Sequence, residues 1–295
     1  IKRTRGCSRH LVGRVVIVTG GNSGIGYDTA KDMAERGAKV ILATRSESRG
    51  TTARDQIIKA TGNPDVHFMQ LDLSSFASIR KFAGDFIKNE KRLDILINNA
   101  GVVDYDKAKT EDGLLFVMQT NHFGPFLLTN LLLPLLKASA PSRIVNVSSM
   151  AHKNGKLDFS DLNLDKVPKE KYGAFRAYGN SKVCNVLMNR ELAKRLEGTG
   201  VTTNSLHPGV IHTNIVKEEN VKWWMKLMVL FGWMFLKSTW EGAQTTIYLA
   251  VSPEVENVSG AYFVDCQKAR ISKLAQDDEV ARKLWEVSES LTKLK

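Results

Sequence analysis

Tyr178 and Lys182 are the residues of this chain whose types and spacing most directly suggest acid–base chemistry. They lie four residues apart in a segment with a helical pattern, so both side chains are expected on one face. A free tyrosine titrates at about pH 10, and a neighbouring ammonium group stabilises the phenolate and lowers that pKa. Such a tyrosine could donate a proton to a carbonyl oxygen, or accept one from an alcohol, near neutral pH. The pair alone is a weak signal, because most Tyr-xxx-Lys sequences are only a helix face.

Two further segments end in residues that suit the same kind of site. Ile144–Ser149 is predicted to be a strand that ends in hydroxyl side chains, and Asn98–Gly101 ends another strand with small residues. Open parallel sheets bind ligands beyond the carboxyl ends of their strands. A serine there can hydrogen-bond a substrate oxygen, and small residues let a cofactor lie close to the backbone. Each segment by itself could equally be an ordinary strand-to-loop turn.

A glycine-rich turn follows the first predicted strand. Gly20, Gly24 and Gly26 come directly after Val15–Thr19 and lead into a helical segment. Glycine permits a tight turn close to a pyrophosphate, and the N–H groups of the helix N-terminus can then bind that phosphate. The strand-to-helix context makes the motif specific and predicts a dinucleotide site. The positive nicotinamide of an oxidised cofactor would add to the effect of an ammonium on the pKa of the tyrosine.

The end of the second predicted strand carries Arg45 and no acidic residue. Dinucleotide sites often place an acid there to bind the ribose hydroxyls. A guanidinium can instead pair with a 2′-phosphate in a bidentate manner. We therefore predict NADP(H) in preference to NAD(H); the alternative is that Arg45 is a solvated loop residue.

Short apolar runs alternate with amphipathic segments along the whole chain. This alternation predicts an α/β fold: one doubly wound Rossmann domain with a mostly parallel, seven-stranded sheet. The predicted strands are Val15–Thr19, Lys39–Ala43, Val66–Gln70, Asp94–Asn98, Arg143–Ser148, Val201–His207 and Ala261–Val264. The predicted helices are Gly26–Arg36, Ser48–Thr61, Ser75–Glu90, Glu111–Lys137 and Lys171–Glu197. A kink or break at Pro125 or Pro134 should interrupt the fourth of these helices.

The composition limits the partners that the chain can have. It holds 42 basic and 31 acidic residues, a net charge of +11 that suits a phosphorylated cofactor, nucleic acid or an acidic membrane face. No nucleic-acid-binding motif is present, so we expect no nucleic acid partner, and we expect no metal. The three cysteines, Cys7, Cys184 and Cys266, are widely spaced and form no CxxC pair, which favours a reducing compartment.

Taken together, TGGNSGIG, NNAG, VNVSS, YGNSK and HPG (His207–Gly209) occur in an order that resembles the short-chain dehydrogenase/reductase superfamily. The fuller text, including LDLSS and SGAYFVDC, is similar to the retinol dehydrogenase 11–14 type, insect relatives included. The resemblance runs from about Gly13 to Ser288. Two departures are Gly21, where the subgroup usually has alanine or serine, and Ser23, where it has threonine. The segment before Tyr178 includes Pro168 and is variable in such proteins, which leaves the substrate-side wall open.

The resemblance implies a role for each matching residue. Tyr178 would be the acid/base, Lys182 would hold the nicotinamide ribose, Ser149 would bind the substrate oxygen with Tyr178, and Asn121 would support a water relay to the lysine. The implied cofactor-binding residues are Gly20, Asn22, Ser23, Gly24, Ile25, Gly26, Arg45, Asp72, Leu73, Asn98, Ala100, Gly101, Tyr178, Lys182, Pro208, Gly209, Val210 and Thr213.

An apolar segment near the C-terminal third bears on the substrate. Its uninterrupted part, Leu227–Leu236, has ten residues, whereas a membrane-spanning helix needs about twenty. It is either a buried helix or, with its tryptophans and flanking lysines, an apolar lid over 213–241 that lies at a membrane interface. A lid of this kind favours a lipophilic substrate, such as a retinoid, a steroid or another long-chain carbonyl.

The remaining expectations concern organisation and activity. Residues 1–12 are a basic flank that either is disordered or follows a removed membrane anchor, and 13–295 form the catalytic domain. We expect an NADP(H)-dependent retinal/retinol oxidoreductase at a membrane surface, intracellular, on the endoplasmic reticulum or another organelle or lipid droplet, with the catalytic domain cytosolic. The alternatives are a broad carbonyl or hydroxysteroid reductase and a catalytically silent nucleotide-binding scaffold on a lipid surface. A homodimer through the long helices and a membrane-bound monomer both remain open.

Overall fold

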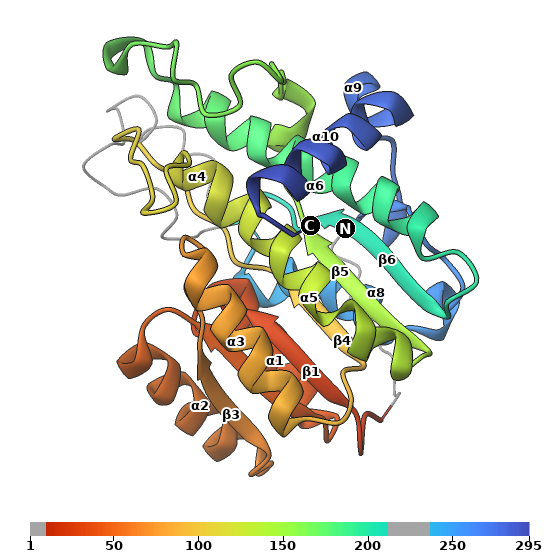
Figure 1. Cartoon of the computed structure of the whole chain (residues 1–295). Coiled ribbons are helices and arrows are strands. Elements are labelled where there is room, and N and C mark those ends of the chain that lie inside the picture. Colours follow the sequence, from red (N-terminus) through yellow and green to blue (C-terminus); the bar gives the residue numbers. More distant parts are fainter. Residues whose placement is uncertain (1–9, 212–236, 295) are drawn as a thin grey trace.

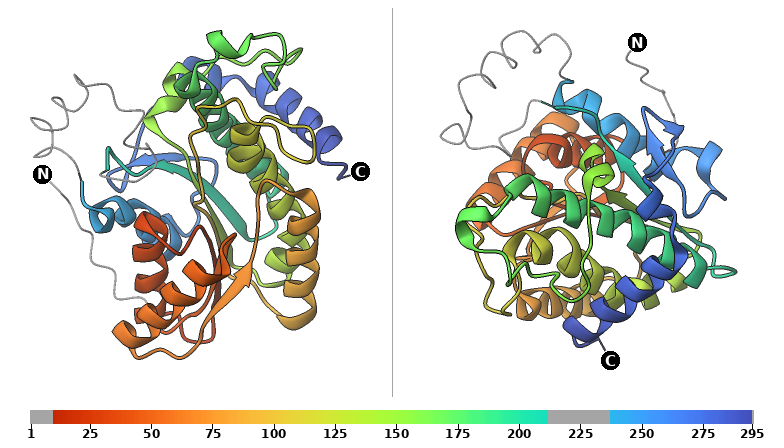
Figure 2. Two further views of the ribbon diagram at one scale, coloured as in Figure 1. Left: turned by 90° about the vertical axis from the view of Figure 1, so that its left-hand side faces the viewer. Right: turned by 90° about the horizontal axis from the view of Figure 1, so that it is seen from above.

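The computed structural model describes residues 10–211 and 237–294. In these ranges one sheet lies between two layers of helices (Figures 1 and 2). The strand order is β3-β2-β1-β4-β5-β6-β7-β8. Strands β1 to β7 pair in parallel, and β8 is antiparallel to β7. The order reverses between β1 and β4, as in a doubly wound sheet whose ligand lies at the reversal point.

The strands are β1 (Val15–Thr19), β2 (Lys39–Thr44), β3 (Val66–Gln70), β4 (Ile95–Asn98), β5 (Ser142–Val147), β6 (Val201–His207), β7 (Tyr262–Val264) and β8 (Gln267–Lys268). The α-helices are α1 (Gly24–Glu35), α2 (Glu47–Thr61), α3 (Phe76–Asn89), α4 (Phe116–Met118), α5 (Gly124–Ala138), α6 (Ala174–Arg195), α8 (Thr239–Val251), α9 (Lys273–Gln276) and α10 (Asp278–Leu291). A π-helical turn, η1, spans Gln119–Phe123, and the 3-10 turns are η2 (Met150–Asn154), η3 (Lys169–Lys171) and η6 (Pro253–Val255).

The single doubly wound α/β domain expected from the sequence is confirmed, with eight strands in the described residues instead of seven. The additional strand, β8, has two exposed residues. It follows a tight turn in which Asp265 and Cys266 both have positive φ, the backbone that a two-residue hairpin requires. Two exposed residues carry no alternating pattern, so the sequence did not reveal this strand.

The predicted helix Glu111–Lys137 is wrong at its start, whereas the interruption expected within it is found next to Pro125. Helical backbone begins at Phe116, because Gly113 takes a positive φ in a turn before it. The break lies at η1, just before Pro125, and α5 then runs through Pro134. Pro125 occupies the first turn of α5, where a missing N–H costs little. The other long helix begins at Ala174 and ends at Arg195, slightly inside its predicted bounds.

Two apolar layers hold the helices on the sheet. One face packs against α1, α2 and α8, and the other packs against α3, α5 and α6. Strands β1, β4 and β5 are buried along their whole length, as expected for parallel strands covered on both faces. Helix α10 lies against α6 and brings Trp285 into the second layer (Figure 1). The core therefore fixes the carboxyl ends of the central strands, which we call the carboxyl edge.

Candidate active site

The structure brings four predicted residues together at the carboxyl edge. Ser149 lies two residues after the end of β5, Tyr178 and Lys182 lie on α6, and Asn121 lies on η1. The Lys182 Nζ atom donates to the carbonyl oxygen of Val147 at 3.1 Å and lies 5.5 Å from the centre of the Tyr178 ring. Elements far apart in the sequence thus converge on one point.

Ser149 lies close enough to the Tyr178 hydroxyl to lower the pKa of that group. Ser149 is the N-cap of η2, and its side chain accepts a bond from the N–H of Ala151 at 3.2 Å. Burial raises the pKa of Tyr178, and the neighbouring Ser149 hydroxyl opposes this effect. The lowered pKa that the spacing predicted is therefore absent from the chain alone, because desolvation disfavours the phenolate more than its neighbours favour it.

Lys182 is almost completely buried, with 2% of its surface exposed. Burial lowers the pKa of its ammonium group to about 8. A Cβ atom on Gly101 would lie only 3.1 Å from its Nζ, so the turn after β4 passes directly over the amine. The lysine thus lies between the tyrosine and the Asn98–Gly101 turn, where a cofactor was predicted to lie close to the backbone.

Asn121 is fixed by a complete set of hydrogen bonds. Its Oδ1 accepts from the N–H of Val102 at 2.8 Å, and its Nδ2 donates to the carbonyl of Val102 and to Ser181 Oγ at 2.9 and 3.0 Å. Ser181 in turn donates to the carbonyl of Tyr178 at 2.7 Å. Pro125 has no N–H to offer the carbonyl of Asn121, so the π-helical turn leaves that oxygen without the usual α-helical partner.

The glycine turn fits a pyrophosphate. Gly20 and Gly24 have positive φ, and a Cβ at Gly24 would meet no atom closer than 4.0 Å, which leaves open space before the helix. A Cβ at Gly26 would lie 2.3 Å from the carbonyl of Gly20, so only glycine lets α1 approach β1. Ser23, the N-cap of α1, makes no side-chain cap bond, and the first turn holds no acid. The partial positive charge at the N-terminus of α1 is therefore not neutralised by its own residues and can bind an anion. Asn22 lies in the turn just before this N-terminus, and Ile25 lies in the first turn of the helix.

The adenine side of the predicted site lies at the ends of β2 and β3. Arg45 is exposed, and its carbonyl accepts from Gln70 Nε2 at 3.3 Å. Asp72 is half-buried, and its Oδ1 accepts from both the N–H and the hydroxyl of Ser74 at 2.9 and 2.6 Å. Leu73 is buried beneath Gly124, where a Cβ would lie 2.5 Å from the carbonyl of Leu73.

In the Asn98–Gly101 turn, the side chain of Asn98 lies in the core, whereas Ala100 and Gly101 lie at the carboxyl edge. Asn98 donates to Thr129 of α5 and to Asn146 of β5, at 3.0 and 2.9 Å, so its amide group is occupied in the core. Ala100 and Gly101 are half-buried at the carboxyl edge. Thr19, which the sequence reasoning missed, accepts from the N–H groups of both Asn99 and Ala100 at 3.0 and 3.1 Å. A hydroxyl at the end of β1 was the available signal for this contact.

The turn after β6 completes the described part of the site. Pro208 is buried, Gly209 has a φ of 99°, and Val210 is exposed. The N–H of Gly209 donates to His207 Nδ1 at 3.3 Å, and the side chain of Lys237 lies against the open face of Gly209 while pairing with Asp265. Thr213 and the predicted lid, apart from 237–241, lie outside the described residues.

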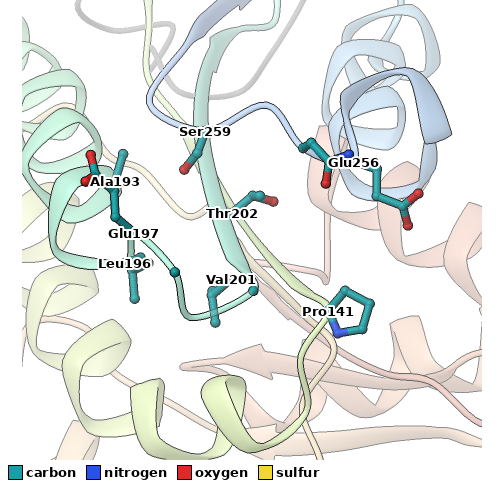
Figure 3. Close-up of a pocket in the computed structure, with 11 residues that line it drawn as sticks. Pro141, Ala193, Leu196, Glu197, Val201, Thr202, Glu256 and Ser259 are labelled. Atoms are coloured by element: carbon teal, nitrogen blue, oxygen red, sulfur yellow. The ribbon is translucent and has the colours of Figure 1, made fainter.

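A separate hollow of about 450 Å³ lies at the opposite edge of the sheet. Figure 3 shows Pro141 and Val201, at the entrances to β5 and β6, beside it, with Glu197 and Glu256 on opposite sides. None of the predicted site residues lines this hollow. The residues suited to chemistry therefore lie at the carboxyl edge, where a doubly wound sheet binds its ligand.

Comparisons with known proteins agree with this arrangement. The family model described as short chain dehydrogenase matches residues 14–160. The chain is 48% identical to retinol dehydrogenase 11 of Mus musculus, over 94% of this chain and 86% of that protein. It is 45% identical to human retinol dehydrogenase 14, over 96% and 87%. A solved Pseudomonas aeruginosa RhlG/NADP active-site complex superposes with a TM-score of 0.69 at 27% identity, covering 92% of this chain and 98% of that one.

Proposed function

The chain belongs to the short-chain dehydrogenase/reductase family, and from that premise we propose that it is an NADP(H)-dependent oxidoreductase interconverting a lipophilic alcohol and its carbonyl compound. The preferred pair is all-trans-retinol and all-trans-retinal. The observation that carries the proposal is the meeting of Ser149, Tyr178, Lys182 and Asn121 at the carboxyl edge. This arrangement also argues against a catalytically silent scaffold, which would not need it.

The chain's own residues supply the proton chemistry. A bound nicotinamide cofactor would supply or accept the hydride. During reduction, the Tyr178 hydroxyl donates a proton to the carbonyl oxygen while Ser149 donates a hydrogen bond to the same oxygen. The Lys182 ammonium, 5.5 Å from the ring centre, stabilises the phenolate that remains. Asn121 holds the Val102 turn and Ser181 in place behind the lysine.

Exposed apolar side chains support a lipophilic substrate. Among the described residues, large exposed hydrophobic side chains include Met150, Phe175, Val210 and Trp240, with exposed fractions of 41% to 54%. Met150 follows Ser149, Phe175 lies one helical turn before Tyr178, Val210 follows the Pro208–Gly209 turn, and Trp240 is in the first turn of α8. Exposed apolar side chains on the segments that carry the polar site residues suit a molecule with a long hydrocarbon body and one oxygen.

The retinoid preference comes from the names of the relatives, retinol dehydrogenases 11 and 14. A membrane surface as partner, an organelle or lipid-droplet location and a lid over 213–241 belong to the same proposal. No helix in the two described ranges is both long and apolar enough to cross a membrane. The expected homodimer stays a prediction.

The direct test supplies the purified protein with NADPH and all-trans-retinal and follows the cofactor absorbance. We expect turnover with NADPH, slower turnover with NADH, and retinol as the product. Parallel reactions with a ketosteroid and a small quinone separate the second candidate, a broad carbonyl or hydroxysteroid reductase. Faster turnover of either compound than of retinal would overturn the retinoid assignment and leave the family assignment intact.

A further inference from the structure

His152 is a fully buried side chain directly behind the Ser149 turn. It lies three residues after Ser149, in η2, and both its backbone N–H and its ring Nδ1 reach the carbonyl oxygen of Ser149, at 3.1 and 2.8 Å. On the other side of the ring, Nε2 is 3.4 Å from the backbone nitrogen of Ser272, the N-cap of α9. One imidazole thus connects the turn of the proposed site with the C-terminal part of the chain.

These contacts select one protonation state. A carbonyl oxygen can only accept, so Nδ1 must carry the hydrogen, and the Ser272 N–H can only donate, so Nε2 must be the acceptor. The ring is therefore neutral and in a single tautomer, and burial, which lowers the pKa of His152, favours the same state. The Tyr262 ring packs on it with centroids 4.9 Å apart, and its hydroxyl lies 3.3 Å from Nδ1.

We propose that His152 is a positioning residue that holds Ser149 in place through the Nδ1–H bond to its carbonyl oxygen. The turn also lies close on α6, since a Cβ at Gly179 would come within 3.0 Å of the carbonyl of Ala151. Backbone packing therefore fixes the distance between the turn and α6, and the imidazole fixes the orientation of the Ser149 peptide group. The inference rests on the proposed function in one respect, that Ser149 binds the substrate oxygen.

Three substitutions separate the two ring nitrogens. His152→Asn places an amide N–H near the Nδ1 position, His152→Gln places one near Nε2, and His152→Phe keeps the ring without either nitrogen. We expect the Asn variant to keep kcat within about threefold, while the Gln and Phe variants lose about 10- to 100-fold, the cost of a misplaced reacting group. The KM for NADPH should change little, because the imidazole is on the substrate side. Tyr262→Phe keeps the ring packing and removes the hydroxyl near Nδ1, so it is the control for that contact and should leave kcat and the pH midpoint near the wild-type values.

The pH profile distinguishes positioning from simple loss of stability. The neighbouring Ser149 hydroxyl lowers the pKa of Tyr178, so displacement of Ser149 should move the midpoint of the pH profile for alcohol oxidation upward. This shift should occur in the Gln and Phe variants and not in the Asn variant. Wild-type kcat and midpoint in the Gln and Phe variants would overturn the proposal, as would equal losses in all three variants that follow their melting temperatures.

The tautomer can be read without any activity. In ¹⁵N-histidine spectra of the wild-type protein, the resonance that disappears in the Asn variant should show protonated Nδ1 and unprotonated Nε2. An Nε2–H tautomer or a charged ring would overturn the inference whatever the substrate proves to be. Failure of the proposed function gives a different result: the wild type would be inactive on retinal, or Tyr178→Phe would remain active, while the histidine spectrum stays as expected.

Discussion

At the scale of single residues, burial is what turns the tyrosine–lysine pair into a site. The four-residue spacing predicted that Tyr178 and Lys182 share a helix face, and the structure confirms this arrangement. Their pKa changes could not be predicted from spacing, because desolvation depends on which strands and turns cover the helix. Burial raises the pKa of the tyrosine and lowers that of the lysine to about 8. His152 was also missed, since a lone histidine carries no motif.

Lys182 should make the cofactor-free protein less stable at neutral pH. The pKa of Lys182 is about 8 in the folded protein and 10.5 in an unfolded chain. Between these two pH values the unfolded chain binds more protons than the folded protein, so the free energy of unfolding rises with pH. Below about pH 8 the lysine is charged in both the folded and the unfolded chain, so this increase in stability is absent. We expect Lys182→Met to unfold at a higher temperature than the wild type at pH 7 and to lack activity. The difference in the free energy of unfolding between Lys182→Met and the wild type should decrease by up to roughly 3 kcal/mol as the pH rises from 8 to 10.5. An advantage that does not depend on pH, in denaturant titrations, would contradict the burial argument.

Arg45 should decide between the two nicotinamide cofactors. Arg45→Ala removes the predicted partner of the 2′-phosphate, and losing a charge-assisted hydrogen bond costs about 1.5–3 kcal/mol. We therefore expect the KM for NADPH to rise about 10- to 100-fold while the KM for NADH changes little. The control is Arg49→Ala, which removes another exposed arginine in the first turn of α2. The same NADPH/NADH ratio in Arg45→Ala and wild type would exclude this role.

At the scale of elements, the strand-to-helix turns and the helix interruption near Pro125 were predictable, whereas the π-helical form of that interruption was not. The glycine spacing after β1 predicted a tight turn, and the structure adds a close Gly26–Gly20 contact that excludes a side chain. The π-helical turn at Asn121 depends on a local mismatch: Pro125 cannot donate an N–H, and Gly124 must pass close to Leu73. The prolines in the sequence predicted that the helix would be interrupted, but the hydrophobic period does not show that the interruption is a π-helical turn.

Two glycine-to-alanine substitutions test this account of the turn. In Gly26→Ala the new Cβ would lie 2.3 Å from a backbone oxygen, and such overpacking costs about 1–3 kcal/mol. The affinity for NADPH should fall with it, because α1 must shift. In Gly84→Ala, on α3, the Cβ meets nothing within 4 Å, and the same change should stabilise the helix by about 0.5–1 kcal/mol. If Gly26→Ala and Gly84→Ala had equal effects on the denaturant midpoint and on NADPH binding, the Gly26–Gly20 contact would not be the reason for glycine at position 26.

At the scale of the whole molecule, the layered α/β domain followed from the alternating pattern, whereas the place of the C-terminal helix did not. Helix α10 comes after β8 and packs on α6, a contact between distant parts of the chain. Its Trp285 meets Phe126 edge-to-face at 4.8 Å and lies under the guanidinium of Arg195 at 4.4 Å. Ser288 of the same helix bonds His122, the neighbour of Asn121, at 2.9 Å. The C-terminal part of the chain therefore supports the π-helical turn as well as the core.

Removal of the Trp285 side chain should weaken the whole domain. Trp285→Ala opens a cavity between α5, α6 and α10, and truncation of a buried tryptophan costs about 3–5 kcal/mol. Trp240→Ala, at a side chain that is 41% exposed, should cost far less. Chemical unfolding of both variants gives the comparison. Equal stability losses would mean that α10 is not part of the cooperative domain.

The role of Tyr178 is decided by the turnover of all-trans-retinal with NADPH in the Tyr178→Phe variant. The substitution removes only the hydroxyl that is proposed to transfer the proton, and general acid–base groups of this kind contribute about 10²- to 10⁴-fold. We expect kcat to fall by that factor while NADPH binding, followed by titration, and the melting temperature stay near the wild-type values. A variant that binds NADPH normally and keeps more than about one tenth of the wild-type kcat would contradict the assignment of Tyr178 as the acid–base residue.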